Sequence, residues 1–255
     1  MAKNALLNLY LLAFNAASGA GWAYVLYLTV TTVLAAYDAG QNWDDVARAT
    51  WDVVALPLKI VQTMAVMEIV HAAVGFVRSP LGSTLMQVSS RLWLVWGINV
   101  LCPVSRYQFG FPLMVASWGL VEVPRYSFYA LNLYDKVPSF LFFLRYHLFM
   151  VLYPSGVLGT SLNPCSYHHA IYCVSEFLRV VVCSVGETLC MVSSLGFLST
   201  GAYSIQLPNT HNASISLFMI VILVLIVYVP GLPVMYGHML TQRNRAYSKP
   251  KTKTA

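Results

Sequence analysis

Long apolar stretches separated by short polar or proline-containing segments dominate the chain. A helix needs about 20 apolar residues to cross the hydrocarbon core of a bilayer, and the stretches that reach this length predict six spans. They run from Leu6 to about Ala36, from Val53 to Phe76, from Leu85 to Val104, from Pro112 to Leu133, from Ser139 to Leu162 and from Ile215 to Leu240. The pattern therefore predicts an all-α, polytopic membrane helical bundle of about six transmembrane helices, formed by a single domain over residues 1–255.

Prolines and charged residues mark where these helices are expected to bend or end. The segment Asp38–Asp52 carries four acidic residues and two tryptophans, which is typical of a loop at the membrane interface. We expect the second helix to bend at Pro57 and to end at Arg78-Ser-Pro80, because proline lacks the backbone N–H that a helix interior needs. The segment from Asn163 to Leu207 is apolar enough to supply one or two further spans.

Composition excludes several other classes of protein. Hydrophobic residues make up 58% of the 255 residues. Charged residues make up only 9%, whereas soluble domains carry about 25%. A water-soluble enzyme, a disordered chain and a disulfide-stapled secreted module are therefore excluded. The five cysteines show no metal-binding spacing, and we interpret them as buried, reduced thiols.

The positive charge of the chain is concentrated near its end. The net charge is +6, and the basic tail at residues 241–255 holds Arg243, Arg245, Lys249, Lys251 and Lys253. A basic segment after an apolar span is typical of the cytoplasmic side, and six spans place the N-terminus on the same side. No nucleic-acid partner is expected, because the rest of the chain is nearly neutral. Lys251-Thr-Lys-Thr-Ala255 resembles a dilysine retrieval signal of the endoplasmic reticulum.

Ionisable side chains inside the predicted spans are candidates for function, because a charge at mid-bilayer costs roughly 3 kcal/mol on insertion scales. Glu68 and His71 share one helical face, and we interpret them as a buried hydrogen-bonded pair. The alternative is metal binding, which would need a second Glu-x-x-His motif that the sequence lacks; no metal or cofactor is expected. Glu122 and Arg125 have the same spacing and predict an internal ion pair. The other candidates are Arg145, His147 and Glu187.

Several strings in the chain occur together, and in this order, in one known family. They include Tyr10-Leu-Leu-Ala-Phe-Asn15, Met67-Glu-Ile-Val-His71, Gln87-Val-Ser-Ser-Arg91, Glu122-Val-Pro-Arg-Tyr-Ser-Phe-Tyr129, Leu152-Tyr-Pro-Ser-Gly156 and Leu207-Pro-Asn209. Over nearly its whole length the chain resembles the very-long-chain (3R)-3-hydroxyacyl-CoA dehydratases, also called protein-tyrosine-phosphatase-like proteins. The resemblance implies a six-helix enzyme of the endoplasmic reticulum membrane. Such an enzyme converts 3-hydroxyacyl-CoA to trans-2-enoyl-CoA in the third step of fatty-acid elongation, alongside the other elongation enzymes.

The resemblance also identifies a catalytic pair. In the family a tyrosine and a glutamate lie in a Tyr-Pro-x-Gly-x-x-x-Glu segment, and the tyrosine corresponds to Tyr153. Thr160 stands where the glutamate is expected, but removing residues 158–184 places Glu187 seven residues after Tyr153. We therefore interpret 158–184 as an insertion, and Tyr153 and Glu187 as the catalytic pair.

Dehydration of a 3-hydroxyacyl thioester needs a base and an acid in one water-poor pocket. With the insertion present, either Glu187 packs near Tyr153 from a neighbouring segment, or the pair separates and the chain is a catalytically impaired scaffold of the elongation complex. A small transporter would need repeat symmetry that we do not find. The residues expected to support the pair are Arg145, Glu68, His71, Glu122 and Arg125. At the cytoplasmic mouth, Arg78 and Arg91 are expected to bind the anionic CoA.

Overall fold

A computed structural model describes residues 2–77, 79–134, 136–152, 186–205 and 216–227, together with residues 237, 241 and 244. Within these ranges the backbone forms helices joined by turns, and no β-strand occurs. The predicted all-α class is confirmed for this part of the chain. Two of its helical stretches, Ala5–Asp38 and Trp43–Val74, are long and apolar enough to cross a membrane.

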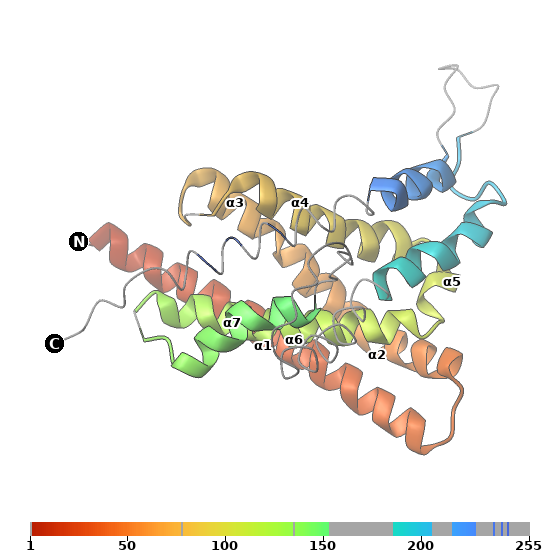
Figure 1. Cartoon of the computed structure of the whole chain (residues 1–255), viewed down its shortest axis with the longest axis horizontal. Coiled ribbons are helices and arrows are strands. Elements are labelled where there is room, and N and C mark those ends of the chain that lie inside the picture. Colours follow the sequence, from red (N-terminus) through yellow and green to blue (C-terminus); the bar gives the residue numbers. More distant parts are fainter. Residues whose placement is uncertain are drawn as a thin grey trace, which may run out of the picture.

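The first two helices run antiparallel along one side of the molecule (Figure 1). They are α1 (Ala2–Asp38) and α2 (Trp43–Met64). The loop predicted over Asp38–Asp52 was wrong, because α2 already begins at Trp43. The side chain of Asn42 accepts a hydrogen bond from the backbone N–H of Asp45 at 2.9 Å, which caps the helix. Acidic residues in the first turn also favour the positive end of the helix dipole, so these acids stabilise a helix start.

The second predicted span consists of two consecutive helices. α2 runs through Pro57 to Met64, the span is interrupted at Ala65, and α3 (Val66–Val74) follows. The expected bend at Pro57 stays a prediction. α3 ends before Gly75, whose φ of 80° is left-handed and favours glycine at the end of a helix. The end therefore comes two residues before the predicted Phe76, and it comes from glycine rather than proline.

The third predicted span begins at Leu81 rather than Leu85 and changes its helix type along its length. α4 (Leu81–Leu92) follows Pro80, and the chain then widens into the π-helix η1 (Trp93–Val100). A Cβ atom at Gly97 would lie 2.8 Å from the Trp93 ring, so the glycine allows this ring to pack on the π-helix backbone. A short helix, α5 (Pro103–Arg106), leads into the next long one.

The fourth span and the start of the fifth agree with the prediction. α6 (Gly110–Asn132) agrees with the predicted Pro112–Leu133 to within two residues, and α7 (Ser139–Leu152) begins at the predicted residue. Further helices run over Gly186–Leu198 and Leu217–Val227, the second of them inside the predicted last span. The predicted insertion at 158–184, the end of the fifth span and most of the basic tail lie outside the described residues.

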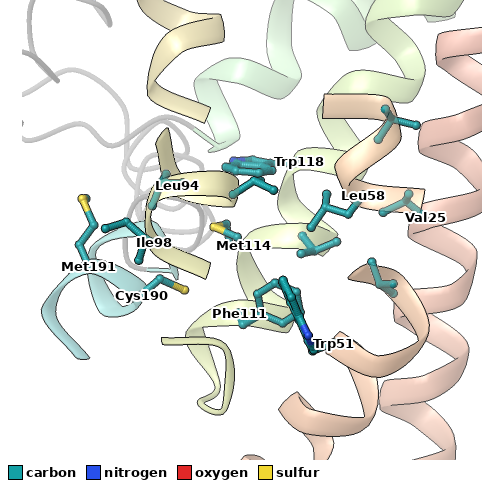
Figure 2. Close-up of a cluster of buried hydrophobic side chains, with 14 of the residues drawn as sticks. Val25, Trp51, Leu58, Leu94, Ile98, Phe111, Met114, Trp118, Cys190 and Met191 are labelled. Atoms are coloured by element: carbon teal, nitrogen blue, oxygen red, sulfur yellow. The ribbon is translucent and has the colours of Figure 1, made fainter. Parts of the chain in front are cut away.

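The buried core surrounds α6, which packs most extensively on α1. Figure 2 shows Met114 and Trp118 of α6 between η1 on one side and α1 and α2 on the other. Glycines let these helices approach closely. A Cβ at Gly21 would lie 2.6 Å from Cγ1 of Val61, and one at Gly119 would lie 2.9 Å from Cβ of Leu26. The small residues thus bring α1 close to both α2 and α6, and α6 carries the polar residues described next.

Candidate active site

One face of α6 carries polar side chains into the interior of the bundle. This polar face of α6 consists of Trp118, Glu122, Arg125, Tyr126 and Tyr129. The residues recur at intervals of three and four, so they lie above one another along the helix. Trp118, Glu122 and Tyr126 are each only 1% exposed. A buried polar row of this kind is costly unless its members are paired, and its members are paired as follows.

Arg125 joins α6 to α3 through a two-point contact with Glu68. Its Nη1 and Nη2 atoms donate to the two carboxylate oxygens of Glu68 at 2.9 and 2.6 Å. The hydroxyl of Tyr126 also donates to Glu68. The guanidinium lies over the Tyr126 ring, 4.6 Å from its centroid. This parallel geometry is the strongest form of an arginine–carboxylate pair.

Glu122 sits between two arginines. Nε of Arg125 donates to its Oε2 at 2.6 Å, and Nη1 of Arg91, from α4, donates to its Oε1. The predicted Glu122–Arg125 ion pair is therefore confirmed, with Arg91 as an additional partner. Two arginines and two glutamates alternate in this network, so their formal charges cancel. Such balance is what permits charged groups to remain inside an apolar bundle.

Glu187 joins this region through Trp118. The indole Nε1 of Trp118 donates to Oε1 of Glu187 at 2.7 Å. The guanidinium of Arg91 lies over the same indole, 5.5 Å from its centroid. Trp118 thus links the carboxyl group of Glu187 to the arginine that binds Glu122. The structure brings Glu187 to the same end of the polar face of α6 as Arg91 and Glu122.

A glycine contact fixes where Glu187 meets α6. A Cβ at Gly186 would lie 2.8 Å from the carbonyl oxygen of Gly110 and 2.9 Å from the backbone nitrogen of Met114. Helix Gly186–Leu198 therefore touches the backbone of α6 directly at its first residue. Nε2 of Gln108 adds a second attachment, donating to the carbonyl oxygen of Leu189 at 2.5 Å. These contacts hold the helix start, and Glu187 with it, against α6.

His71 bonds a residue of α1, and Arg145 bonds a residue of α6. The hydroxyl of Tyr10 and Nε2 of His71 share a hydrogen bond of 2.8 Å. Glu68 bonds Arg125 and Tyr126, so the predicted Glu68–His71 hydrogen-bonded pair was wrong: each residue has a separate partner on another helix. Nη2 of Arg145 donates to the hydroxyl of Tyr129 at 3.0 Å.

Of the residues singled out in the sequence, the structure gathers Glu68, Arg91, Glu122, Arg125 and Glu187 around the polar face of α6. Arg145 reaches its far end through Tyr129. Tyr153 and Arg78 lie outside the described residues, so the position of the predicted catalytic tyrosine stays a prediction. The expected role of Arg91 in binding CoA also stays a prediction; in the structure Arg91 contacts Glu122 and Trp118.

Three aromatic members of this arrangement were missed in the sequence. Trp118 and Tyr126 each lie four residues from Glu122, and Tyr129 lies four from Arg125. Helical spacing from the predicted ion pair would have placed all three on its face. Their aromatic character alone gave no such indication, because aromatic residues are common in membrane helices.

The arrangement offers proton-transfer groups in an apolar surrounding. The Glu187 carboxyl group can exchange a proton with a bound molecule, and the ion pairs beside it add no net charge. Among the described residues, no group of three or more His, Cys, Asp or Glu side chains is placed to hold a metal ion. The chemistry that these residues suggest is acid–base chemistry.

Comparison with known proteins finds one family model and several relatives that share the same enzyme name. The sequence model of a family described as "Protein tyrosine phosphatase-like protein, PTPLA" matches residues 62–176 and 180–249. The chain is 38% identical to very-long-chain (3R)-3-hydroxyacyl-CoA dehydratase hpo-8 from Caenorhabditis elegans, over 92% of this chain and 93% of that protein. It is 37% identical to very-long-chain (3R)-3-hydroxyacyl-CoA dehydratase PASTICCINO 2 from Arabidopsis thaliana, over 96% and 95%. It is 33% identical to very-long-chain (3R)-3-hydroxyacyl-CoA dehydratase 2 from Mus musculus, over 94% and 81%. No solved structure matches the chain.

Proposed function

The chain belongs to the protein tyrosine phosphatase-like family, PTPLA, and from that premise we propose that it is a very-long-chain (3R)-3-hydroxyacyl-CoA dehydratase. The main support for this function is sequence similarity: over more than nine tenths of its length, the chain is 36–38% identical to relatives that bear this name. The enzyme is a hydro-lyase and acts in the third step of microsomal fatty-acid elongation. The scaffold alternative is not favoured, because these relatives are named for the dehydratase activity.

The reaction moves two protons and breaks one carbon–oxygen bond. A base takes a proton from C2 of the (3R)-3-hydroxyacyl-CoA, and the electron pair of that C–H bond forms the C2–C3 double bond. The C3–O bond breaks, and an acid gives a proton to the leaving hydroxyl group, which departs as water. The product is trans-2-enoyl-CoA. No carbon is oxidised or reduced overall by an outside reagent, so the step needs no redox cofactor.

Tyr153 and Glu187 divide the two proton transfers in this proposal. The resemblance of Tyr153-Pro-Ser-Gly156 to the family segment supports the tyrosine. The contact between Glu187 and the buried Trp118 supports the glutamate, since it holds a carboxyl group beside the interior of the bundle. Arg145, Glu68, His71, Glu122 and Arg125 support the site by holding the surrounding helices together. Arg78 and Arg91 remain the proposed contacts to CoA.

The membrane setting follows from the substrate and from the apolar helices. A very long acyl chain is insoluble in water, and an apolar helical bundle can shelter it while the polar CoA stays outside. We place the protein in the endoplasmic reticulum membrane, with six transmembrane helices, both termini cytoplasmic and other elongation enzymes as partners. The two stretches suited to crossing a membrane support this setting. Co-fractionation with markers of that membrane, and protease protection of tags at both ends, test the location and the orientation.

The domain organisation is part of the same proposal. Residues 1–255 form one membrane-embedded unit, with an insertion at 158–184 and a basic tail at 241–255. In this organisation Glu187 keeps its contact with α6 although the insertion precedes it in the chain. The Gly186–Gly110 contact supports this point, because it attaches the chain to α6 two residues after the insertion ends.

The decisive experiment supplies the purified protein, in nanodiscs, with a long-chain (3R)-3-hydroxyacyl-CoA and measures the 2-enoyl-CoA product by chromatography. We expect turnover by the wild type. Tyr153→Phe and Glu187→Gln should each lower kcat by at least about 100-fold, since a positioned acid or base contributes about 10²–10⁴-fold.

The matched control for the tyrosine is Tyr37→Phe, because Tyr37 lies at the far end of α1 and is 68% exposed; its kcat should equal that of the wild type. Absence of product with the wild type would reject the function for this chain. Full activity of Tyr153→Phe would reject the assignment of the site while leaving the reaction in place.

A further inference from the structure

Trp118 lies between two charged groups, the guanidinium of Arg91 and the carboxyl group of Glu187. Its side chain is 1% exposed, its ring packs edge-on against Trp22 at a centroid distance of 6.4 Å, and its indole N–H points to Oε1 of Glu187. Figure 2 shows the indole above Met114 on α6. A buried indole N–H needs an acceptor, and here the acceptor is a carboxylate oxygen of a residue on another helix, 69 positions further along the chain.

We propose that Trp118 is a positioning residue for the dehydration, and that its indole N–H fixes the orientation of the Glu187 carboxyl group toward the substrate. This inference rests on the proposed catalytic role of Glu187. Indole is suited to the task because Nε1–H is its single polar group and can only donate. A carboxylate oxygen is the acceptor that binds such a donor most strongly.

The ring itself is held from two sides, which makes the donor rigid. Trp22 packs against one part of it, and the guanidinium of Arg91 lies over the ring at 5.5 Å. Glu122 in turn holds Arg91. The direction in which the N–H points is therefore set by residues on α1, α4 and α6, whereas Glu187 arrives from a helix far along the chain. Catalysis depends on such positioning, since a displacement of about 1 Å can cost about 100-fold in rate.

The test compares two tryptophans that both donate a hydrogen bond. Trp118→Phe removes the indole N–H and leaves an aromatic ring beneath Arg91. The control is Trp96→Phe, because Trp96 is 45% exposed and faces α2, where its Nε1 donates to Oγ1 of Thr63 at 3.2 Å and Lys59 lies over its ring. We expect kcat of Trp118→Phe to fall about 10- to 100-fold, the range for losing a hydrogen bond to a charged group. KM should change less than about threefold, and Trp96→Phe should match the wild type in both constants.

A second variant separates the hydrogen bond from the packing of the ring. Benzothienylalanine incorporated at position 118 has nearly the shape of tryptophan but no N–H. The same fall in kcat is expected from it, so it decides the matter if Trp118→Phe does not fold. In a Glu187→Gln background, loss of the indole N–H should lower kcat by less than about a further threefold. The reason is that the effects of two residues acting as a unit are not additive.

A measurement independent of turnover keeps this inference distinct from the proposed function. The indole N–H resonance of Trp118, identified by its absence in Trp118→Phe, should move in Glu187→Gln while the Trp96 resonance does not. A wild type without dehydratase activity would reject the proposed function, and an active Glu187→Gln would reject the catalytic role of Glu187. In either case the resonance would still report whether the hydrogen bond exists. An unmoved resonance, or an unchanged kcat in the benzothienylalanine variant when Glu187→Gln is inactive, would overturn the role of Trp118 alone.

Discussion

Arg125 and Glu68 meet in a two-point contact although 57 residues separate them in the sequence. The same guanidinium bonds Glu122 one turn earlier on its own helix, so a single arginine ties α3 to α6 and satisfies two carboxyl groups. Removing it would leave Glu68 without an arginine partner and Glu122 with Arg91 alone. Arg125 is therefore the central residue of the charge network.

We predict that Arg125→Ala lowers the free energy of unfolding by about 3–5 kcal/mol, because breaking a buried pair leaves uncompensated charge. The Arg125→Ala/Glu68→Ala double variant should lose less than the sum of the two single variants, by about 0.5–3 kcal/mol. Denaturant titration in mixed micelles measures all three. The control is Arg48→Ala, an exposed arginine over the Tyr107 ring, which should cost about 1 kcal/mol or less. A loss for Arg125→Ala as small as that of the control would contradict the network.

The charge network shows what could and could not be predicted from the sequence. The Glu122–Arg125 pair was predicted because its two members are neighbours on one helix, where spacing alone decides contact. The bonds from Arg125 to Glu68 and from Arg91 to Glu122 were not predicted, because they depend on how α3, α4 and α6 pack. Glu68 and His71 share a face by spacing, yet Tyr10 and Arg125 supply closer partners from other helices.

The helix ends were predicted least well, and for local reasons. The acids near Asp44 were attributed to an interfacial loop, although acids are also favoured in the first turn of a helix. The cap at Asn42 and the left-handed Gly75 were the sequence signals that placed the actual boundaries. The long apolar interiors, such as that of α6, were predicted to within two residues, since a bilayer-length apolar run leaves few alternatives.

The contact of Gly21 with Val61 gives a prediction about how α1 and α2 pack. Gly21→Ala should lower the free energy of unfolding by about 1–3 kcal/mol, because the new methyl group would meet Cγ1 of Val61 at 2.6 Å. In a Val61→Ala background the same change should cost less than half as much, since the clashing atom is gone. Denaturant titration of the four proteins measures this difference. An equal cost in both backgrounds would show that the side chain of Val61 does not set the limit.

Gly186 gives a prediction about activity rather than packing. A Cβ there would press on backbone atoms of Gly110 and Met114, at 2.8 and 2.9 Å, and backbone cannot move aside as a side chain can. Gly186→Ala should therefore displace the start of its helix, and Glu187 with it, and lower kcat by about 10- to 100-fold. The product assay in nanodiscs measures this effect.

The same helix contains the control for that experiment. A Cβ at Gly196 meets no atom within 4 Å, so Gly196→Ala should leave kcat unchanged and stabilise the helix by up to about 1 kcal/mol. Equal loss of activity in both variants would mean that the helix tolerates no alanine for reasons unrelated to Glu187. Full activity of Gly186→Ala would mean that the close contact with α6 does not position the carboxyl group.

The proposed insertion leads to a prediction about the length of the chain between the catalytic pair. Deleting residues 158–184 places Tyr153 and Glu187 seven residues apart, about two helical turns, so that both side chains lie on one face roughly 10 Å from each other. We predict that the deletion variant folds and dehydrates the long-chain substrate at least as fast as the full chain. Tyr153→Phe in that background should lower kcat by about 100-fold or more. A deletion variant that folds but forms no product, beside an active full chain, would show that residues 158–184 are part of the catalytic unit and not an addition to it.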